Sequence, residues 1–486
     1  MITNKKTWLS RTYCRHASRC CLLCLRARRF VELRRIIRVC SCLLVLLSIP
    51  AVAQQVDEVR EITPDRWRRA AEVSALVELE SALGTRYGRF QKSELLISPE
   101  LELKLGPDSV LTVTGRFRTD IEDRLEPGAR TQYKRSDFNR RETFGDRTDF
   151  ELRELVLETT LGDTYLTLGK QQLVWGQADG LKVLDVVNPQ DFREFILDGF
   201  DDSRIPLWAV NVEIPIRDVV LQLIWIPDPT YHEIPWLEGT YAFISPALIP
   251  EAPPGVTVNI ESPDSPDDMV ADSDIGLRLS TFWKGWDLTL NYFYHYHDEP
   301  VLYQQLSLVA PVPTVTIKPR YRRSHLIGGT FSNAFGDLTL RGEVGLALER
   351  HLSTTNVSDA DGVVKTDELA GVLGLDWFGY SETLISLQIF QNWVTRHGDD
   401  VIRKEFDINV TLLIQRDFLN KRWQTEFFWL HNANDGDGLI RPKLSHDFQT
   451  SLKVWIGADI FYGDRDGLFG QYQRNDRIVV GCEWGM

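Results

Sequence analysis

The sequence predicts an all-β protein: a transmembrane, antiparallel, up-and-down β-barrel of about 16–18 strands, with short periplasmic turns and long extracellular loops. Three observations predict this fold class. Apolar and polar residues alternate over segments of about 10–12 residues. Tight turns and long polar loops follow these segments in alternation, and a leader typical of exported proteins precedes them.

The first 53 residues of the 486-residue chain differ from the rest. They contain eleven basic residues against the single acid Glu32, then the apolar run Val39–Pro50 and the small-x-small triplet Ala51–Ala53. This order is typical of a secretory signal peptide, here with an extended basic region. We expect cleavage between Ala53 and Gln54.

The chain that remains after the leader is acidic and holds one cysteine. Six of the seven cysteines lie in the leader, among them Cys21 and Cys24, whose spacing would otherwise indicate a zinc or redox site. We expect all six to leave with the leader, so that only Cys482 remains and no internal disulfide forms. The net charge after residue 53 is −24, which argues against nucleic acid as a partner.

Residues 54–75 are expected to form a short periplasmic or luminal segment before a barrel that occupies residues 76–486. Within this segment Thr63, Pro64 and Asp65 resemble a helix N-cap and first turn, which predicts a short helix over residues 64–74. No apolar run of about 20 residues occurs after position 55, so no helical membrane span is expected.

Alternation with a period of two identifies the strands. Residues 286–296 (WDLTLNYFYHY), 337–349 and 405–414 have one apolar and one polar face, and Arg341, Glu343, Asp407 and Asn409 would face the lumen. Strands of a soluble sandwich usually have about 5–6 residues, whereas these are long enough to cross about 25 Å of hydrocarbon when tilted. We predict 18 strands, with 16 as the alternative count, near residues 76–88, 94–105, 110–119, 149–161, 164–174, 206–216, 218–227, 274–283, 287–297, 321–332, 337–350, 367–378, 383–394, 404–415, 422–432, 438–447, 451–462 and 475–485.

The connections alternate between tight links, such as 106–109 and 162–164, and long polar loops, such as 120–148 and 175–205. Short turns on one rim and long loops on the other are typical of outer-membrane barrels. The proline-rich loop 228–272 is expected to be extracellular and partly disordered. Its acidic residues either are solvated or bind a divalent cation; they are Glu261, Asp264, Asp267 and Asp268.

The last predicted strand supports the same fold. Ile478, Val480, Cys482 and Trp484 share one parity and would face lipid. An aromatic residue near the end of such a strand resembles the signal read by the barrel-assembly machinery, although the chain ends in Met486 rather than in Phe or Trp. The expected partners are therefore this machinery, outer-membrane lipid and lipopolysaccharide.

The stretch 169–194, GKQQLVWGQADGLKVLDVVNPQDFRE, opens the long early loop 177–205. Early long loops in porins often fold into the lumen and narrow it. Polar residues in this loop either hold it together or line a constriction that sorts solutes by charge and size. The candidates for the constriction are Gln171, Trp175, Gln177, Asp179, Lys182, Asp185, Asn188, Asp191, Arg193 and Arg204.

The same stretch carries a resemblance to a known family. The matching residues are Gly169, Gln171, Trp175, Gly176, Asn188, Pro189 and Asp191, with Lys170 where arginine is common. They resemble the signature of a proteobacterial outer-membrane β-barrel family of unknown function, related to porin-like and alginate-export-type barrels. The resemblance covers most of residues 74–486 and implies a passage across the outer membrane. By association it also implies a periplasmic carrier and an inner-membrane exporter as partners.

These observations favour a porin-like channel or transport conduit in the Gram-negative outer membrane. The alternative is a conduit for lipid-like or polymeric cargo that works with the periplasmic carrier and the exporter. A barrel enzyme, the minor alternative, needs a serine beside a histidine, but Ser280 is predicted near the turn side, far from His295. His295 and His297 are more typical of an exposed rim than of a metal site. We therefore expect no enzymatic activity, cofactor or metal.

Overall fold

The computed structural model describes residues 70–486, except 129–131, 133, 236, 247, 249–254, 267, 308–312, 357–358 and 450. The predicted leader, its cleavage site and residues 64–69 of the predicted helix lie outside the described residues. Ala70–Met486 form one compact unit. Within the described part of this unit, no helix is long and apolar enough to span a membrane.

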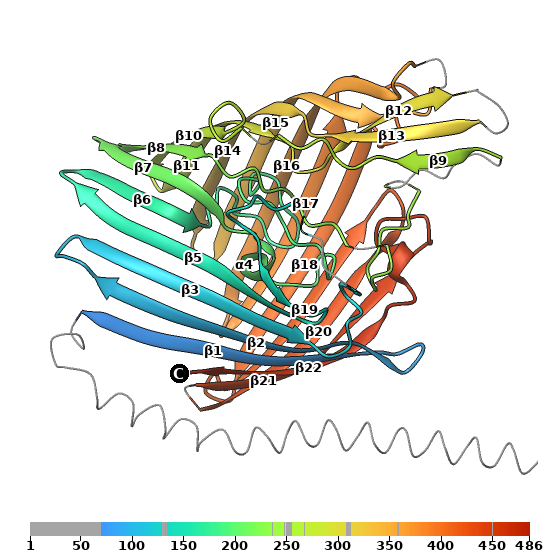
Figure 1. Cartoon of the computed structure of the whole chain (residues 1–486). Helices are drawn as coiled ribbons and strands as arrows, with labels where there is room; N and C mark the ends of the chain where they lie inside the picture. The colour runs from blue at the N-terminus through green and yellow to red at the C-terminus, as the bar shows by residue number, and fades with distance from the viewer. Residues whose placement is uncertain are drawn as a thin grey trace, which may run out of the picture. The chain divides into compact units, whose positions relative to one another are not determined.

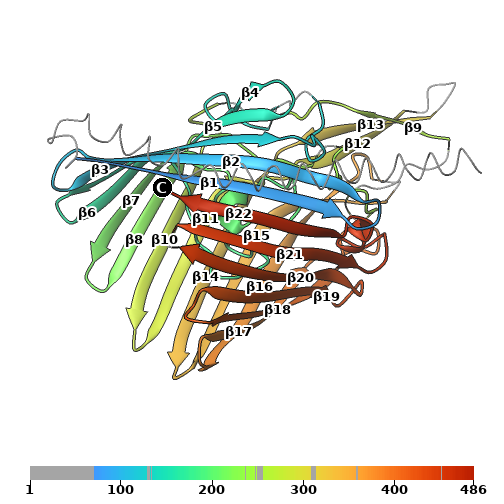
Figure 2. The same cartoon turned by 90° about the horizontal axis from the view of Figure 1, so that it is seen from below.

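Eighteen strands of this unit form a closed antiparallel barrel (Figure 1). Each pairs with its neighbours in chain order, and β22 closes the ring on β1 (Figure 2). In this pairing Leu79 lies opposite Cys482. The barrel strands are β1 (Ala71–Gly84), β2 (Arg89–Lys104), β3 (Ser109–Asp120), β5 (Thr148–Leu161), β6 (Thr164–Gln171), β7 (Leu207–Ile216), β8 (Val219–Ile226), β10 (Asp274–Trp283), β11 (Trp286–Tyr296), β14 (Arg323–Phe335), β15 (Leu338–Ser353), β16 (Val363–Tyr380), β17 (Thr383–Val394), β18 (Phe406–Phe418), β19 (Trp423–Asn432), β20 (Asp437–Gln449), β21 (Leu452–Tyr462) and β22 (Arg477–Gly485).

The predicted fold class and strand count are confirmed, but the N-terminal boundary differs. β1 begins at Ala71, within the predicted helix, and ends at Gly84, before the predicted end of the first strand at residue 88. Residues 71–79 pair in continuous register with residues 95–103 of β2. The Ala- and Glu-rich sequence favours a helix locally, and this ladder overrides the preference.

Four short strands lie in regions expected to be loops: β4 (Glu142–Phe144), β9 (Thr257–Ile260), β12 (Val301–Ser307) and β13 (Thr314–Arg320). β12 and β13 form an antiparallel hairpin, and β9 pairs with β13 in parallel. Glu261 and Asp264 of the acidic loop each lie 4.0 Å from a basic side chain of β13, Lys318 and Arg320 respectively. Asp267 lies outside the described residues.

Alternation predicted the two faces of the barrel strands. Val344 and Ile408 are 50% and 36% exposed on the outer face, whereas Glu343 and Asn409 are 4% and 9% exposed. Cys482 keeps the outward parity of exposed Ile478, because the register of β22 with β1 and β21 is unbroken, but its side chain is only 7% exposed.

Arginine at an outward position should destabilise the barrel. Leu346→Arg and Ile408→Arg are each expected to lower the free energy of unfolding by about 2–4 kcal/mol, because a charge would enter the hydrocarbon region. Urea unfolding in lipid vesicles measures this. Ile216→Arg, beside a short turn, is the matched control and should cost about 0–1 kcal/mol. Near-normal stability of both midplane variants would contradict the register.

Candidate functional site: a segment across the lumen

The connection between β6 and β7 runs through the inside of the ring (Figures 1 and 2). We call residues 172–206 the lumen segment; it includes the one-turn helix α4 (Phe200–Ser203). Its hydrogen bonds and ion pairs reach strands around the barrel, including β2, β5, β15, β17 and β22. The segment therefore crosses the lumen and does not lie over a rim.

Three of the constriction candidates are buried and hold the two ends of the segment. The Asn188 side chain accepts a hydrogen bond from the Leu173 amide at 2.6 Å and donates to the carbonyls of Gln171 and Ile205. The Gln171 amide donates to the Ala209 carbonyl at 3.1 Å. Trp175, 1% exposed, donates to Gln222 on β8 at 3.0 Å and packs edge-on against Phe293. These contacts tie the segment to β6, β7 and β8.

Glu343 and Arg341 of β15 were both expected to face the lumen. They bind residues 177–184 of the segment. The Glu343 carboxylate accepts backbone N–H bonds from Gln177, from Ala178 at 2.7 Å and from Leu184 at 3.1 Å. Arg341 donates to the Gln177 carbonyl and pairs with Asp179, the most exposed of the candidates at 52% side-chain exposure. Hydrogen bonds to a buried carboxylate are among the strong ones in proteins.

The close approach of the segment to the far wall requires glycine at position 180. Gly180 has φ +87°, and a Cβ there would lie 2.7 Å from the Phe428 ring on β19. A larger residue at position 180 would meet both an unfavourable backbone conformation and the Phe428 ring.

A charged cluster stabilises the middle of the segment. Asp185 pairs with Lys182 and with Arg204, each at 2.9 Å, and Lys182 also donates to Gln190 at 2.8 Å. The Lys182 ammonium lies 4.6 Å from the centre of the Phe200 ring. Burial lowers the pKa of Lys182 to about 8, against the opposing effect of Asp185. Lys182 therefore remains largely protonated at neutral pH.

Residues 193 and 194 of the segment form buried ion pairs with β2 and β22. Arg193 binds the Glu94 carboxylate of β2 through two hydrogen bonds of 2.6 and 2.9 Å. Glu194 accepts from Arg477 of β22 at 2.8 Å and lies 2.6 Å from Lys92 of β2. Removing one partner of such a pair leaves an uncompensated buried charge.

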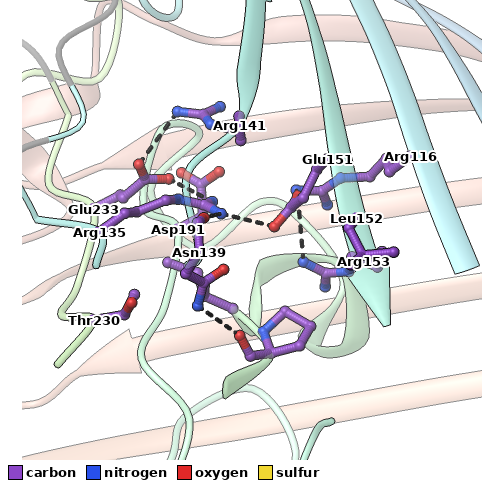
Figure 3. A network of polar contacts seen from close by, with 12 residues as sticks. Arg116, Arg135, Asn139, Arg141, Glu151, Leu152, Arg153, Asp191, Thr230 and Glu233 are labelled. Atoms are coloured by element: carbon purple, nitrogen blue, oxygen red, sulfur yellow. Dashed lines mark hydrogen bonds and ion pairs between the residues drawn. The ribbon is translucent and has the colours of Figure 1, made fainter. Parts of the chain in front are cut away.

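A second ion-pair network fills the lumen beside β3 and β5 (Figure 3). Glu151 is surrounded by Arg116 at 2.5 Å, Arg135 at 2.7 Å, Lys170 at 3.6 Å and Arg153 at 4.0 Å. Glu233, from the connection after β8, accepts from both Arg135 and Arg141.

Asp191 joins this network from the lumen segment, 3.8 Å from Arg118, and burial raises the pKa of its carboxyl group.

Sequence reasoning missed these wall residues. A usable signal was present: charges stand at every second position in Arg116 and Arg118 of β3 and in Asp149, Glu151 and Arg153 of β5. Charges repeated on one parity of a membrane strand indicate a charged lumen wall. Their pairing depends on residues from distant loops and cannot be read from that pattern.

The remaining lumen-facing candidates, Asp407 and Asn409, bind a neighbouring strand and not the segment. The Asn432 amide of β19 donates to Asp407 at 2.6 Å and to Asn409 at 3.1 Å. They are therefore part of the polar wall of β18 and β19.

A cavity of about 350 Å³ lies between the lumen segment and strands β11 and β14–β17. Its lining combines apolar residues of the segment with polar residues of the wall. His295 and His297, expected at an exposed rim, line it instead, and His295 is 6% exposed and stacks on Phe293. His232 also lines the cavity, and burial lowers its pKa to about 3. His295 is buried because the segment folds inward over it.

Ser280 and His295, the pair considered from the sequence, lie on different strand pairings and do not face each other. Ser280 lies opposite Thr289 on β11, whereas His295 lies opposite Ser324 on β14. The Ser324 hydroxyl donates to the Leu348 carbonyl at 2.9 Å. Within the described ranges, no group of three or more His, Cys, Asp or Glu side chains has the arrangement of a metal site.

The closed ring of long strands, its apolar outer face and its charged lumen define an integral outer-membrane β-barrel. The chain belongs to the family described as Protein of unknown function (DUF1302), whose model matches residues 88–481. No curated protein sequence matches the chain.

Several solved structures are similar in fold. The outer membrane protein OpdK from Pseudomonas aeruginosa has 10% identity and a TM-score of 0.48, over 86% of this chain and 99% of that chain. P. aeruginosa OccK2 (OpdF) in complex with glucuronate has 10% identity and a TM-score of 0.48, over 86% and 98%. OmpTdeltaL8, a loop-deletion mutant of an outer membrane protein of Vibrio cholerae, has 9% identity and a TM-score of 0.39, over 86% and 99%. These similarities concern the fold alone.

Proposed function

We propose that this barrel is a porin-like channel or transport conduit of the outer membrane, narrowed by the lumen segment. The observation that carries the proposal is the path of the segment, which is bonded to opposite walls of the lumen. Barrels of 16–18 strands leave an aqueous channel unless loops fill it. The segment therefore sets the width of the path, and the constriction role of its residues stays a prediction.

The lumen differs on the two sides of the segment, and this difference indicates on which side solutes would pass. Ion-pair networks fill the side of β2–β5 and β20–β22, where Glu94, Glu151 and Arg477 are buried. The cavity lies on the side of β11 and β14–β17. We infer that solutes pass along the wall of β11 and β14–β17, beside the Asp179–Arg341 pair.

Conductance in planar bilayers tests this proposal. The mature chain, beginning at Gln54, is expected to show a small steady conductance, and deletion of residues 178–203 should raise it several-fold because the main obstruction is removed. Because the deletion also removes Arg193 from Glu94 and Glu194 from Arg477, folding of each form must be checked by its heat-dependent migration in gels. Absence of conductance in both folded forms would contradict a diffusion channel.

The second candidate function is a conduit for lipid-like or polymeric cargo that works with a periplasmic carrier and an inner-membrane exporter. One observation favours it: Leu181, Val183 and Val186 give the cavity an apolar wall. Such a conduit would be closed to ions until its partner binds. Contacts with lipopolysaccharide and with the barrel-assembly machinery remain predictions for either function.

A further inference from the structure

We propose that the cavity beside the lumen segment binds a small amphipathic carboxylate. Its carboxylate would pair with Arg350, and its apolar body would lie against the lumen segment. The inference rests on the proposed function only in placing the cavity on the route through the barrel. It names the chemical class of solute that this side of the lumen recognises.

Arg350 supplies an incompletely paired buried cation. It lies on β15, is 7% exposed, and lines the cavity. Its Nε donates to Glu368 at 3.2 Å, while its two terminal nitrogens have no recorded hydrogen bond among the described residues. The other oxygen of Glu368 lies 2.9 Å from Arg403. Two guanidinium groups thus share one carboxylate, and the free N–H fork of Arg350 suits a second carboxylate.

A β-bulge places this cation in the lumen. From Arg341 through Glu343, every second residue of β15 faces inward, and continued alternation would bring Glu349 inward and Arg350 outward. The register with β16 instead shifts between Ala347 and Arg350, and Glu349 has φ +63°. Glu349 is consequently exposed and pairs with Lys365 at 2.9 Å, which corrects the inward position expected from alternation. Because of the bulge, the cation Arg350 and not the anion Glu349 faces the cavity.

The other charged groups of the lining do not cancel this cation. Asp185 is already paired with Lys182 and Arg204. Burial raises the pKa of both Asp298 and Glu299, which favours their neutral, hydrogen-bond-donating forms. His232 is neutral near pH 7 because burial lowers its pKa. Asp198 also lines the cavity and lies 3.9 Å from Arg193, and His295 and His297 are the other titratable residues of the lining. The strand wall of the cavity is therefore polar, with a positive charge at Arg350.

The apolar part of the lining gives the ligand its second feature. Leu181, Val183, Val186 and Phe192 of the lumen segment face Ala370 and other small residues of the strands. The volume of about 350 Å³ falls in the usual range for small-molecule sites, roughly 300–1,000 Å³. A short apolar chain or ring that ends in one carboxylate matches both the size and the polarity.

Calorimetric titration of the folded barrel in detergent tests the inference with octanoate and octanamide, which differ in charge and hardly in shape. Octanoate is expected to bind about 10- to 100-fold more tightly, since it forms charge-assisted bonds to Arg350. Arg350→Gln should remove most of this preference. Arg441→Gln is the matched control, because Arg441 faces the lumen outside the cavity and pairs with Asp459 at 2.8 Å; it should retain the preference.

Ala370→Leu supplies an independent variant that leaves every charge in place. The larger side chain should weaken both ligands at least about ten-fold by filling the cavity, while the preference for octanoate persists. Equal binding of the two ligands to the unmodified protein, or binding unaffected by both Arg350→Gln and Ala370→Leu, would overturn the inference. The binding measurement does not depend on conductance. If the folded barrel binds octanoate but does not conduct, the channel proposal is contradicted and the binding site is supported. If it conducts but does not bind octanoate, the binding site is contradicted and the channel proposal is supported.

Discussion

Replacing Glu343 with alanine is expected to raise the conductance of the barrel by about two-fold or more, because the lumen segment loses its anchor on β15. The Glu343 carboxylate accepts three backbone N–H bonds from residues 177–184. Each N–H left buried without a partner costs about 1–3 kcal/mol. The segment is expected to leave its position so that water can reach these groups. Single-channel recording in planar bilayers measures the change.

Two further variants show whether the anchor is responsible. Glu343→Gln keeps the shape and one acceptor oxygen, and should give a smaller rise. Glu426→Ala removes another carboxylate of the lumen wall that makes no recorded hydrogen bond to the segment, and should leave the conductance unchanged. A point variant also avoids the loss of the buried Glu94–Arg193 and Arg477–Glu194 ion pairs that deletion of residues 178–203 would cause. If Glu343→Ala conducts like the unmodified protein, the segment does not limit passage.

Replacing Glu151 with glutamine is expected to lower the free energy of unfolding by about 3–5 kcal/mol, the usual cost of breaking a buried ion pair from one side. Glu151 is fully buried and lies within ion-pair distance of Arg116, Arg135, Arg153 and Lys170. Glutamine would leave these four cations facing one another without the central anion. Urea unfolding in lipid vesicles, followed by tryptophan fluorescence, measures the loss.

The matched control for this effect is Glu158→Gln. Glu158 lies on the same strand, β5, but is exposed. Its replacement should change stability by no more than about 0.5 kcal/mol, as is usual for exposed positions. A similar small change for Glu151→Gln would show that the network near β3 and β5 contributes little to the stability of the barrel.

Several features of the fold could be predicted because their signals are local. Alternation along Trp286–Tyr296 or Phe406–Phe418 depends only on which side of one strand meets lipid, so it predicted both the strands and the lumen-facing Arg341 and Glu343. The loop after β6 was also recognisable, since its turn residues and charges contrast with the flanking strands. The sequence identified the ten constriction candidates in and beside this loop. It did not show where each side chain lies.

The place of each side chain of the segment in the lumen could not be predicted, because it depends on partners that are distant in the sequence. Asp179 lies half exposed beside Arg341, whereas Trp175 and Asn188 are buried among β6–β8. Nothing within the loop sequence distinguishes them. The same holds for Arg193, whose partner Glu94 lies 99 residues away on β2.

The barrel, the order of its strands and the presence of a long charged loop after β6 could be inferred from the sequence, because each follows from short-range periodicity and composition. Three features became visible only in the folded chain: this loop crosses the lumen, Glu151 and Glu194 form ion pairs with distant strands, and a bulge turns Arg350 inward. These features arise from pairing between residues far apart in the chain, and a single-residue shift of register reverses which side chain faces the lumen.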